Sequence, residues 1–209
     1  MKSLILKIFR KFKNYIYSCN SAIWYEKKTD NSIKHVVSDI EIKVDFRNSN
    51  IIPWLKEHHP TYSWLYILKE IECAEKYDHI YATFVYEEEI IGYIKIGIKN
   101  VYVADFDEIV TVPSGVAYIY DTFVLPAYRK KNIIPHAFNT ILSFLRGRGI
   151  NEIFCHIPAW NIASIRLYKK LGFKEVAFIL FGRIFWLKFL IRDRNKVCFK
   201  VRTLFSTLL

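Results

Sequence analysis

Two short segments carry the residue types that could bind an anionic ligand and act on it. The first, FVLPAYRKKNII at residues 123–134, ends an apolar run at Pro126 and carries Arg129, Lys130 and Lys131 ahead of an amphipathic run. A helix that begins there presents unpaired backbone N–H groups and the positive end of its dipole beside three basic side chains, which suits a phosphate. By itself, this arrangement also fits a solvated basic turn.

The second segment, NIASIRLYKKLGF at residues 161–173, begins with a residue type that caps helices and ends with one that stops them. Together the two segments resemble the GNAT superfamily of acyl-CoA N-acyltransferases. The acetyl-CoA signature of that family, Val-x-Pro-x-x-Arg-x-x-Gly-x-Gly, is matched by Val124, Pro126 and Arg129. Its later signature, Asn-x-x-Ser/Ala-x-x-x-Tyr-x-x-x-Gly-Phe, is matched by Asn161, Ser164, Tyr168, Gly172 and Phe173. The specific match covers about residues 116–181.

The chain departs from the first signature at two positions where the family has glycine, Asn132 and Ile134. Asn tolerates a left-handed backbone, so Asn132 is a mild change. Ile134 keeps its backbone N–H but adds bulk where a pyrophosphate would approach. The sequence is therefore compatible with either a functional or a degenerate CoA site.

The resemblance implies a central mixed β-sheet, splayed between the strands at 116–125 and 152–157, with the pantetheine arm of acetyl-CoA in the opening. The residues that it implies for donor binding are Phe123, Val124, Leu125, Arg129, Lys130, Lys131, Asn132, Ile133, Ile134, Asn161, Ser164 and Tyr168.

The resemblance also makes Tyr168 the candidate acid that protonates the departing thiolate, with a core aromatic as the alternative. The backbone N–H of Val124 or its neighbour is the candidate oxyanion donor. Asp121 is the nearest acid for the base, and a structural hydrogen bond to the next loop is an equal alternative. If strand alternation holds, Tyr118 and Tyr120 lie on the face opposite Asp121.

Hydrophobic periodicity predicts the elements that position these residues. Strands are expected at 22–28, 40–46, 79–86, 90–98, 116–125 and 152–157, and helices at 51–77, broken near 58–60, from about 132, and from 161. A hairpin that turns at Gly182 and an edge strand near 196–203 would complete a mixed α/β domain with parallel and antiparallel pairing.

The composition fits one folded domain with appendages, because 52% of the 209 residues are hydrophobic and 17% are aromatic. Residues 1–17 place Ile5, Ile8, Phe9, Phe12 and Ile16 at helical spacing among basic residues, which predicts an N-terminal amphipathic helix. We therefore expect an N-terminal helix and extension over 1–38 and an acyltransferase domain over 39–209. The helix is a candidate peripheral membrane anchor or an ordinary surface helix.

The net charge of +11 is unevenly spread, with −7 over residues 14–121 and positive blocks over 1–13, 122–182 and 183–209. This asymmetry suggests a cationic ligand on one surface and an anionic one on another, although ordinary solvated charge has the same appearance. Four widely spaced cysteines, no cleavable signal pattern and no 20-residue apolar run indicate a cytoplasmic protein, with membrane contact at most peripheral.

The sequence thus predicts an acetyl-CoA-dependent N-acetyltransferase acting on a primary amine of a small molecule, amino sugar or protein, in a ternary complex. The alternative is a degenerate module that binds an anionic membrane or, less favoured, nucleic acid through its basic ends. Metal binding is not expected, because His58 with His59, and Cys155 with His156, lack further ligands. The HxxxD match at His35 and Asp39 has no supporting motif. The sequence indicates neither the acceptor, the acyl chain length nor the oligomeric state.

Overall fold

The computed structural model describes residues 17–30, 33, 36–46, 51–58, 64–105, 107–184, 187–192 and 200–201. Its strands are β1 (Tyr17–Lys28), β2 (Lys43–Asp45), β3 (Ile80–Tyr86), β4 (Glu89–Gly97), β5 (Asn100–Val103), β6 (Glu108–Thr111), β7 (Val116–Val124), β8 (Glu152–Pro158), β9 (Lys174–Ile184), β10 (Leu187–Arg192) and β11 (Lys200–Val201). Its helices are α2 (Ile51–His58), α3 (Trp64–Lys76), the 3₁₀ turn η1 (Pro126–Tyr128), α4 (Ile133–Gly147) and α5 (Ile162–Lys170). The predicted mixed α/β fold is confirmed.

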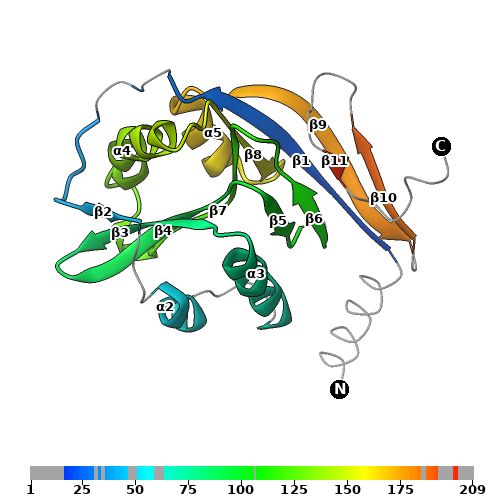
Figure 1. Cartoon of the computed structure of the whole chain (residues 1–209), viewed down its shortest axis with the longest axis horizontal. Coiled ribbons are helices and arrows are strands. Elements are labelled where there is room, and N and C mark those ends of the chain that lie inside the picture. The colour runs from blue at the N-terminus through cyan, green and yellow to red at the C-terminus, as the bar shows by residue number, and fades with distance from the viewer. Residues whose placement is uncertain are drawn as a thin grey trace.

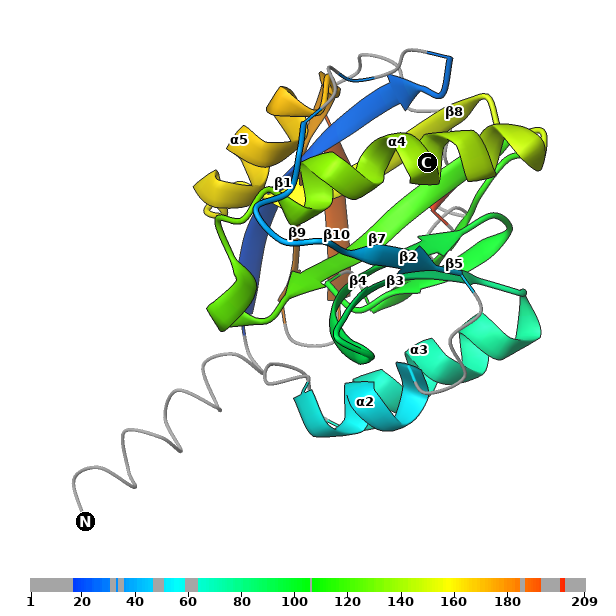
Figure 2. The ribbon, with the colours of Figure 1, turned by 90° about the vertical axis from the view of Figure 1, so that its left-hand side faces the viewer.

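Within the described residues, eight strands form one sheet in the order β10-β9-β1-β8-β7-β4-β3-β2. In that sheet β7 and β8 pair in parallel and the other neighbours pair antiparallel. Strands β5, β6 and β11 form a second small sheet. Helices α4 and α5 lie on one side of the main sheet, and α2 and α3 lie on the other (Figures 1 and 2).

Strand β1 lies in the interior of the main sheet, although the expected boundary at residue 38 assigns it to an N-terminal extension. It pairs with β8 from Ala22 to Lys28 and with β9 from Tyr17 to Glu26, and Figure 1 shows it running beside β9. Residues 17–28 are therefore part of the same sheet. The expected amphipathic helix falls almost wholly on residues 1–16, which lie outside the described residues.

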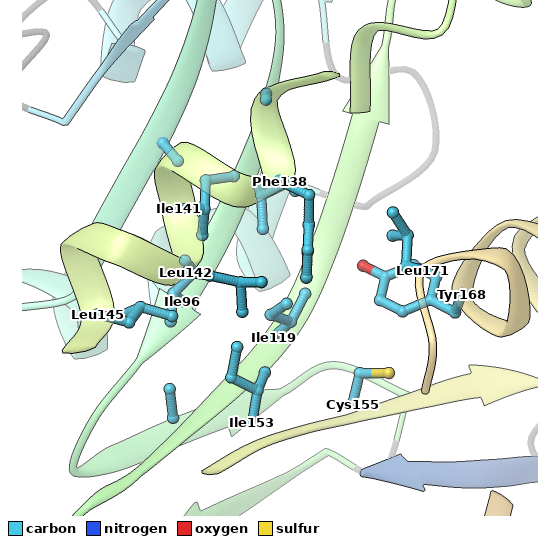
Figure 3. Close-up of a cluster of buried hydrophobic side chains, with 14 of the residues drawn as sticks. Ile96, Ile119, Phe138, Ile141, Leu142, Leu145, Ile153, Cys155, Tyr168 and Leu171 are labelled. Carbon is cyan, nitrogen blue, oxygen red and sulfur yellow. The ribbon is translucent and has the colours of Figure 1, made fainter. Parts of the chain in front are cut away.

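The main core lies between α4 and the sheet, where α4 buries the apolar stripe that its spacing predicts. Ala137, Phe138, Ile141, Leu142 and Leu145 have at most 1% of their surface exposed. Figure 3 shows four of these side chains, Phe138, Ile141, Leu142 and Leu145, facing apolar residues of β4, β7 and β8. Burial of each large apolar side chain stabilises the fold by about 1.5–3 kcal/mol, so this layer fixes α4 against the sheet.

The parallel strands β7 and β8 pair only at their beginnings. The paired positions run from Val116 opposite Glu152 to Ile119 opposite Cys155. Both strands continue beyond this point, β7 to Val124 and β8 to Pro158, without pairing to each other. The splay implied by the family resemblance is therefore present.

A β-bulge in β7 changes which way Asp121 points. Lys95 of β4 lies opposite Asp121 while Ile96 lies opposite Ile119, so Tyr120 is an extra residue in the pairing. Because of this extra residue, Asp121 lies on the same side of the sheet as Tyr118 and Tyr120. The prediction that it lies on the opposite face is wrong.

The expected C-terminal hairpin is present, but its turn is shifted. Gly182 lies inside β9, which continues to Ile184 before β10 begins at Leu187. The long β1 strand provides a pairing partner for the whole of β9, which explains why β9 does not end at its glycine. The pair β5–β6 was not predicted, because no alternation marks residues 100–111.

Candidate active site

A cavity of about 340 Å³ lies where β7 and β8 separate. Four of its lining residues, Ile119, Thr122, Cys155 and Tyr168, belong to the side of the sheet that α4 and α5 cover. Tyr120, Asp121, His156 and Asp105 line it from the other side. The remaining lining residues are Ile157, Pro158, Trp160, Asn161 and Ser164. The cavity therefore passes through the gap in the sheet and can admit one ligand from each side.

Tyr168 projects from α5 into the core, with its hydroxyl toward β7 (Figure 3). The hydroxyl lies 2.7 Å from Thr122 Oγ1, and the ring packs edge-on against Phe173 with 5.0 Å between centroids. Burial raises the pKa of Tyr168 well above its usual value. The phenol thus keeps its proton at neutral pH and can donate it to a developing thiolate in the cavity.

The carboxylate of Asp121 is held by partners on β4. Its Oδ2 accepts a hydrogen bond from Tyr93 Oη at 2.8 Å and lies 3.1 Å from Lys95 Nζ. Lys95 also pairs with Glu70 of α3 at 2.8 Å. Burial opposes the charge of Lys95, but Asp121 and Glu70 outweigh it and raise the pKa of Lys95. A structural role for Asp121 is thus present, through β4 rather than through the next loop.

The turn before α4 contains a run of backbone N–H groups suited to an anion. Among the described residues, the N–H groups of residues 130–134 find no hydrogen-bond acceptor. Lys130 and Asn132 have positive φ angles of 66° and 54°. Alternation of left-handed and other conformations points successive N–H groups into one concavity, which binds anions. Asn132 adopts the left-handed conformation that its residue type tolerates.

Ile134 leaves this concavity open, because its half-buried side chain packs against the main core. Lys131 places its Nζ 5.5 Å from the centre of the Tyr128 ring, and Lys130 is exposed. Both lysines therefore stand beside the N–H groups with their charge accessible. Arg129 instead turns back toward β7, where its Nε donates to the Val124 carbonyl at 3.0 Å.

A segment before β2 fixes the position of this turn from outside. The Lys131 carbonyl accepts hydrogen bonds from Ser38 Oγ at 3.0 Å and from the Asp39 N–H at 3.2 Å. One turn further along α4, His136 Nδ1 lies 3.1 Å from the Val36 carbonyl. The carbonyl of Lys131 is thereby held away from the concavity, and its N–H groups keep their direction.

The end of β7 directs one backbone N–H into the splay. The N–H of Leu125 donates to the Ile91 carbonyl opposite it at 2.9 Å. The neighbouring antiparallel pair, Val124 with Gly92, is therefore a non-hydrogen-bonded pair, whose N–H groups point away from each other. The Val124 N–H thus points into the gap that β8 leaves, whereas the Leu125 N–H is already used. Phe123 packs beside Tyr93 on the α2 side.

Asn161 caps α5 as predicted, because its Oδ1 accepts the Ser164 N–H at 3.1 Å. Both residues line the cavity, and this hydrogen bond leaves the amide NH₂ of Asn161 for another acceptor. Trp160, beside them at the cavity rim, is 76% exposed. The start of α5 therefore offers one polar and one large apolar group to a ligand.

A His–Asp pair on the other side of the cavity was missed in the sequence. His156 Nε2 lies 2.9 Å from Asp105 Oδ2, and His156 Nδ1 lies 2.6 Å from Tyr118 Oη. Asp105 follows β5, a strand that the sequence did not indicate, 51 residues before His156. The residue types alone carried no signal of this pairing.

The described part of the chain lacks two features, a membrane-spanning helix and a metal-binding cluster. No helix there is both long and apolar enough to cross a bilayer. Nor does that part bring together three or more His, Cys, Asp or Glu side chains in a group that could hold a metal ion.

The similarity of the chain to known proteins centres on this region. Residues 43–173 match the family model described as Acetyltransferase (GNAT) family. The chain is 24% identical over 102 residues to the Uncharacterized N-acetyltransferase YycN of Bacillus subtilis (strain 168). This stretch covers 49% of the chain and 59% of YycN, so it spans less than two thirds of that relative.

Solved structures share the fold at low sequence identity. A GCN5-related N-acetyltransferase from Sphaerobacter thermophilus superposes with a TM-score of 0.56 at 12% identity, covering 85% of this chain and 56% of that one. AAC(6')-Iy, in complex with the bisubstrate analogue CoA-S-monomethyl-acetylneamine, superposes with a TM-score of 0.51 at 20% identity, covering 65% of this chain and 92% of that one. At these identities, the likeness concerns the fold alone.

Proposed function

The chain belongs to the GNAT acetyltransferase family, and on that premise we propose that it transfers an acetyl group from acetyl-CoA to a primary amine in a ternary complex. The observation that carries the proposal is the cavity at the β7–β8 splay, with an anion-binding turn beside it. The chain of YycN is matched only in part, so the acceptor is proposed from the geometry of this chain and not from its relatives.

Acetyl-CoA would bind along the splay, with its pyrophosphate on the N–H groups of residues 130–134. Lys130 and Lys131 would face the adenosine phosphates, and Asn161 would contact the pantetheine arm. Among the other residues that the resemblance implies, Phe123 and Leu125 would contact the pantetheine arm, although the Leu125 N–H is already bonded to Ile91. Ser164 would line the arm, and Arg129 would hold the end of β7 through its hydrogen bond to Val124. The N–H groups without an acceptor among the described residues and the packing of Ile134 against the main core support this placement.

The reaction forms a C–N bond to the acetyl carbonyl carbon and breaks its C–S bond, while the amine loses one proton and the thiolate gains one. The Val124 N–H, which points into the gap, would stabilise the tetrahedral oxyanion. Tyr168 would protonate the leaving thiolate. Asp121 is the proposed acceptor of the amine proton, and its place in the cavity lining supports this role.

Thermal unfolding with and without acetyl-CoA tests the donor site. Specific binding at a ligand concentration of one hundred times Kd stabilises the folded state by about 2.7 kcal/mol. ATP at matched ionic strength is the polyanion control. A shift with acetyl-CoA and little with ATP is expected, and the absence of a shift with acetyl-CoA would contradict the proposal.

Equal shifts with both ligands would favour the alternative function, a module that binds anions through charge alone. That alternative depends on the basic blocks at the two ends of the chain, where few residues are described. Salt titration of vesicle and nucleic-acid binding separates it from the enzyme, because charge-driven binding weakens steeply with salt.

We also propose a cytoplasmic location, with residues 1–17 as a peripheral contact to anionic membrane. The basic side chains and apolar spacing of that segment support the proposal. Co-sedimentation with anionic vesicles, with and without residues 1–17, is the test. Equal binding by both forms would eliminate the anchor.

A further inference from the structure

Asp105 is the second carboxylate that lines the cavity, and its surroundings differ from those of Asp121. The charge of Asp121 is compensated by Lys95 at 3.1 Å. Within the described residues, Asp105 has no lysine or arginine within ion-pairing distance. Its side chain keeps 33% of its surface exposed at the cavity. While the imidazole of His156 is neutral, Asp105 is thus the less compensated negative charge on the α2–α3 side of the cavity.

The direction of the Asp105 carboxylate is fixed by a chain of buried groups. Burial alone would raise the pKa of Asp105, but the hydrogen bond from His156, together with the positive charge of His156 when it is protonated, outweighs burial and lowers the pKa. Asp105 is therefore an ionised acceptor, and His156 Nε2 must carry the proton that it receives. In the neutral imidazole, Nδ1 then accepts the hydroxyl proton of Tyr118, and Tyr118 stacks on Trp24 with 5.4 Å between centroids.

This support occupies one oxygen of the carboxylate. His156 donates to Oδ2, and no described residue forms a hydrogen bond or ion pair with Oδ1. An ionised carboxylate accepts hydrogen bonds at both oxygens, and charge-assisted bonds to ammonium groups are the strong ones. The arrangement therefore suits a cationic group that enters the cavity from the α2–α3 side.

The cation held by Asp105 is not the reacting amine, because an ion pair with a carboxylate favours the protonated form of an amine, and a protonated amine cannot attack a carbonyl. The reacting nitrogen must instead reach the region of Val124 and Tyr168. Tyr168 contributes to the cavity from the α4–α5 side, whereas Asp105 and His156 contribute from the opposite side. A ligand that reaches both groups spans the gap between the strands.

We propose that the acceptor is an amine with a second positive charge, a diamine or polyamine, and that Asp105 binds that second charge with His156 as its positioning residue. The proposal rests on the proposed acetyltransferase function and names the acceptor class for the same cavity. Asp105 determines specificity, and the bond-making step takes place in the gap between the strands, near Val124 and Tyr168.

The experiment compares linear α,ω-diamines of three to six carbons with monoamines of the same chain lengths, using acetyl-CoA as donor. The wild-type protein should prefer its best diamine over the matching monoamine by about 10- to 100-fold in kcat/KM, as one charge-assisted hydrogen bond allows. Asp105→Asn should remove this preference by raising KM for the diamine, with little change for the monoamine. Equal use of both amines by the wild-type protein, or an equal loss for both in Asp105→Asn, would overturn the proposal.

Variants of His156 test whether this residue positions the Asp105 carboxylate or only stabilises the fold. Gln keeps an N–H donor near the position of Nε2, so His156→Gln should retain most of the preference for the diamine, whereas His156→Phe should lose it. Loss in both, with unchanged unfolding temperatures, would refute the positioning role.

Binding without turnover provides an independent measurement. Diamines should raise the unfolding temperature of the wild-type complex with CoA, and should not raise that of the Asp105→Asn complex. No shift of the wild-type complex would overturn the proposal. Since the shift caused by acetyl-CoA alone is measured separately, failure of this acceptor proposal is distinguishable from failure of the donor site.

Discussion

Replacement of Tyr168 by Phe separates catalysis from packing, because it removes one oxygen atom and keeps the ring. The ring contact with Phe173 is retained, and the hydrogen bond to Thr122 at 2.7 Å is lost. A hydrogen bond of this kind contributes about 0.5–1.5 kcal/mol to the free energy of unfolding. Loss of a general acid lowers turnover by about 10²- to 10⁴-fold, which is about 2.7–5.4 kcal/mol of activation free energy. The catalytic effect should therefore exceed the effect on stability.

Thr122→Val is the matched control, since it removes the same hydrogen bond from the other side and keeps the Tyr168 hydroxyl. We expect similar losses of stability in the two variants, measured by chemical unfolding. Only Tyr168→Phe should lose kcat by two or more orders of magnitude in a CoA-release assay, with the KM for acetyl-CoA little changed. Unchanged turnover in Tyr168→Phe, or equal losses in both variants, would refute the assignment of Tyr168 as the acid.

Three further predictions address the fold, the donor turn and the base. A Cβ on Gly92 would lie 2.5 Å from a backbone oxygen of β7, so Gly92→Ala should destabilise the protein by about 1–3 kcal/mol in urea unfolding. Gly147 has open space around it, so the control Gly147→Ala should not destabilise the protein. Similar free energies of unfolding for both variants would contradict the close approach of β4 and β7 at Gly92. Asn132 has a left-handed backbone with a φ of 54°, which Gly adopts readily and Ala does not. Asn132→Ala should therefore cost about 1 kcal/mol of stability and weaken acetyl-CoA binding in calorimetry, whereas Asn132→Gly should retain binding. Equal binding by both variants would count against the left-handed turn. Asp121→Asn should abolish turnover, whereas Tyr93→Phe, which removes one hydrogen bond to Asp121, should keep most of the turnover. Comparable losses of turnover in the two variants would assign Asp121 a structural role only.

Local patterns in the sequence predicted those parts of the fold that local forces determine. The stripe from Ala137 to Leu145 and the cap at Asn161 depend on residues within one or two helical turns, and both are present. The strands β7 and β8 were predicted for a related reason, since central strands of a parallel pair are apolar on both faces.

The parts that could not be predicted depend on partners distant in the sequence. The bulge at Tyr120 exists because β7 must match the register of β4, and nothing in the order of residues in β7 marks the extra one. The same holds for the contact between Asp105 and His156, which requires β5 to be placed beside the open end of β8. The side of the cavity formed by the turn before α4 and by α5 was therefore predictable from the sequence, and the side that holds Asp105 and His156 was not.

The interior position of β1 has a consequence for how the chain acquires its structure during synthesis. This strand emerges from the ribosome before its partners β8 and β9, which span residues 152–184 and are made more than 120 residues later. Until then both edges of β1 are unpaired, and its buried residues Ala22, Trp24 and Tyr25 have no core to enter. Contacts of such long sequence separation slow folding, and uncovered strand edges favour aggregation. The nascent chain is thus expected to complete its main sheet only after β8 and β9 have been synthesised, and to depend until then on chaperones that shield β1.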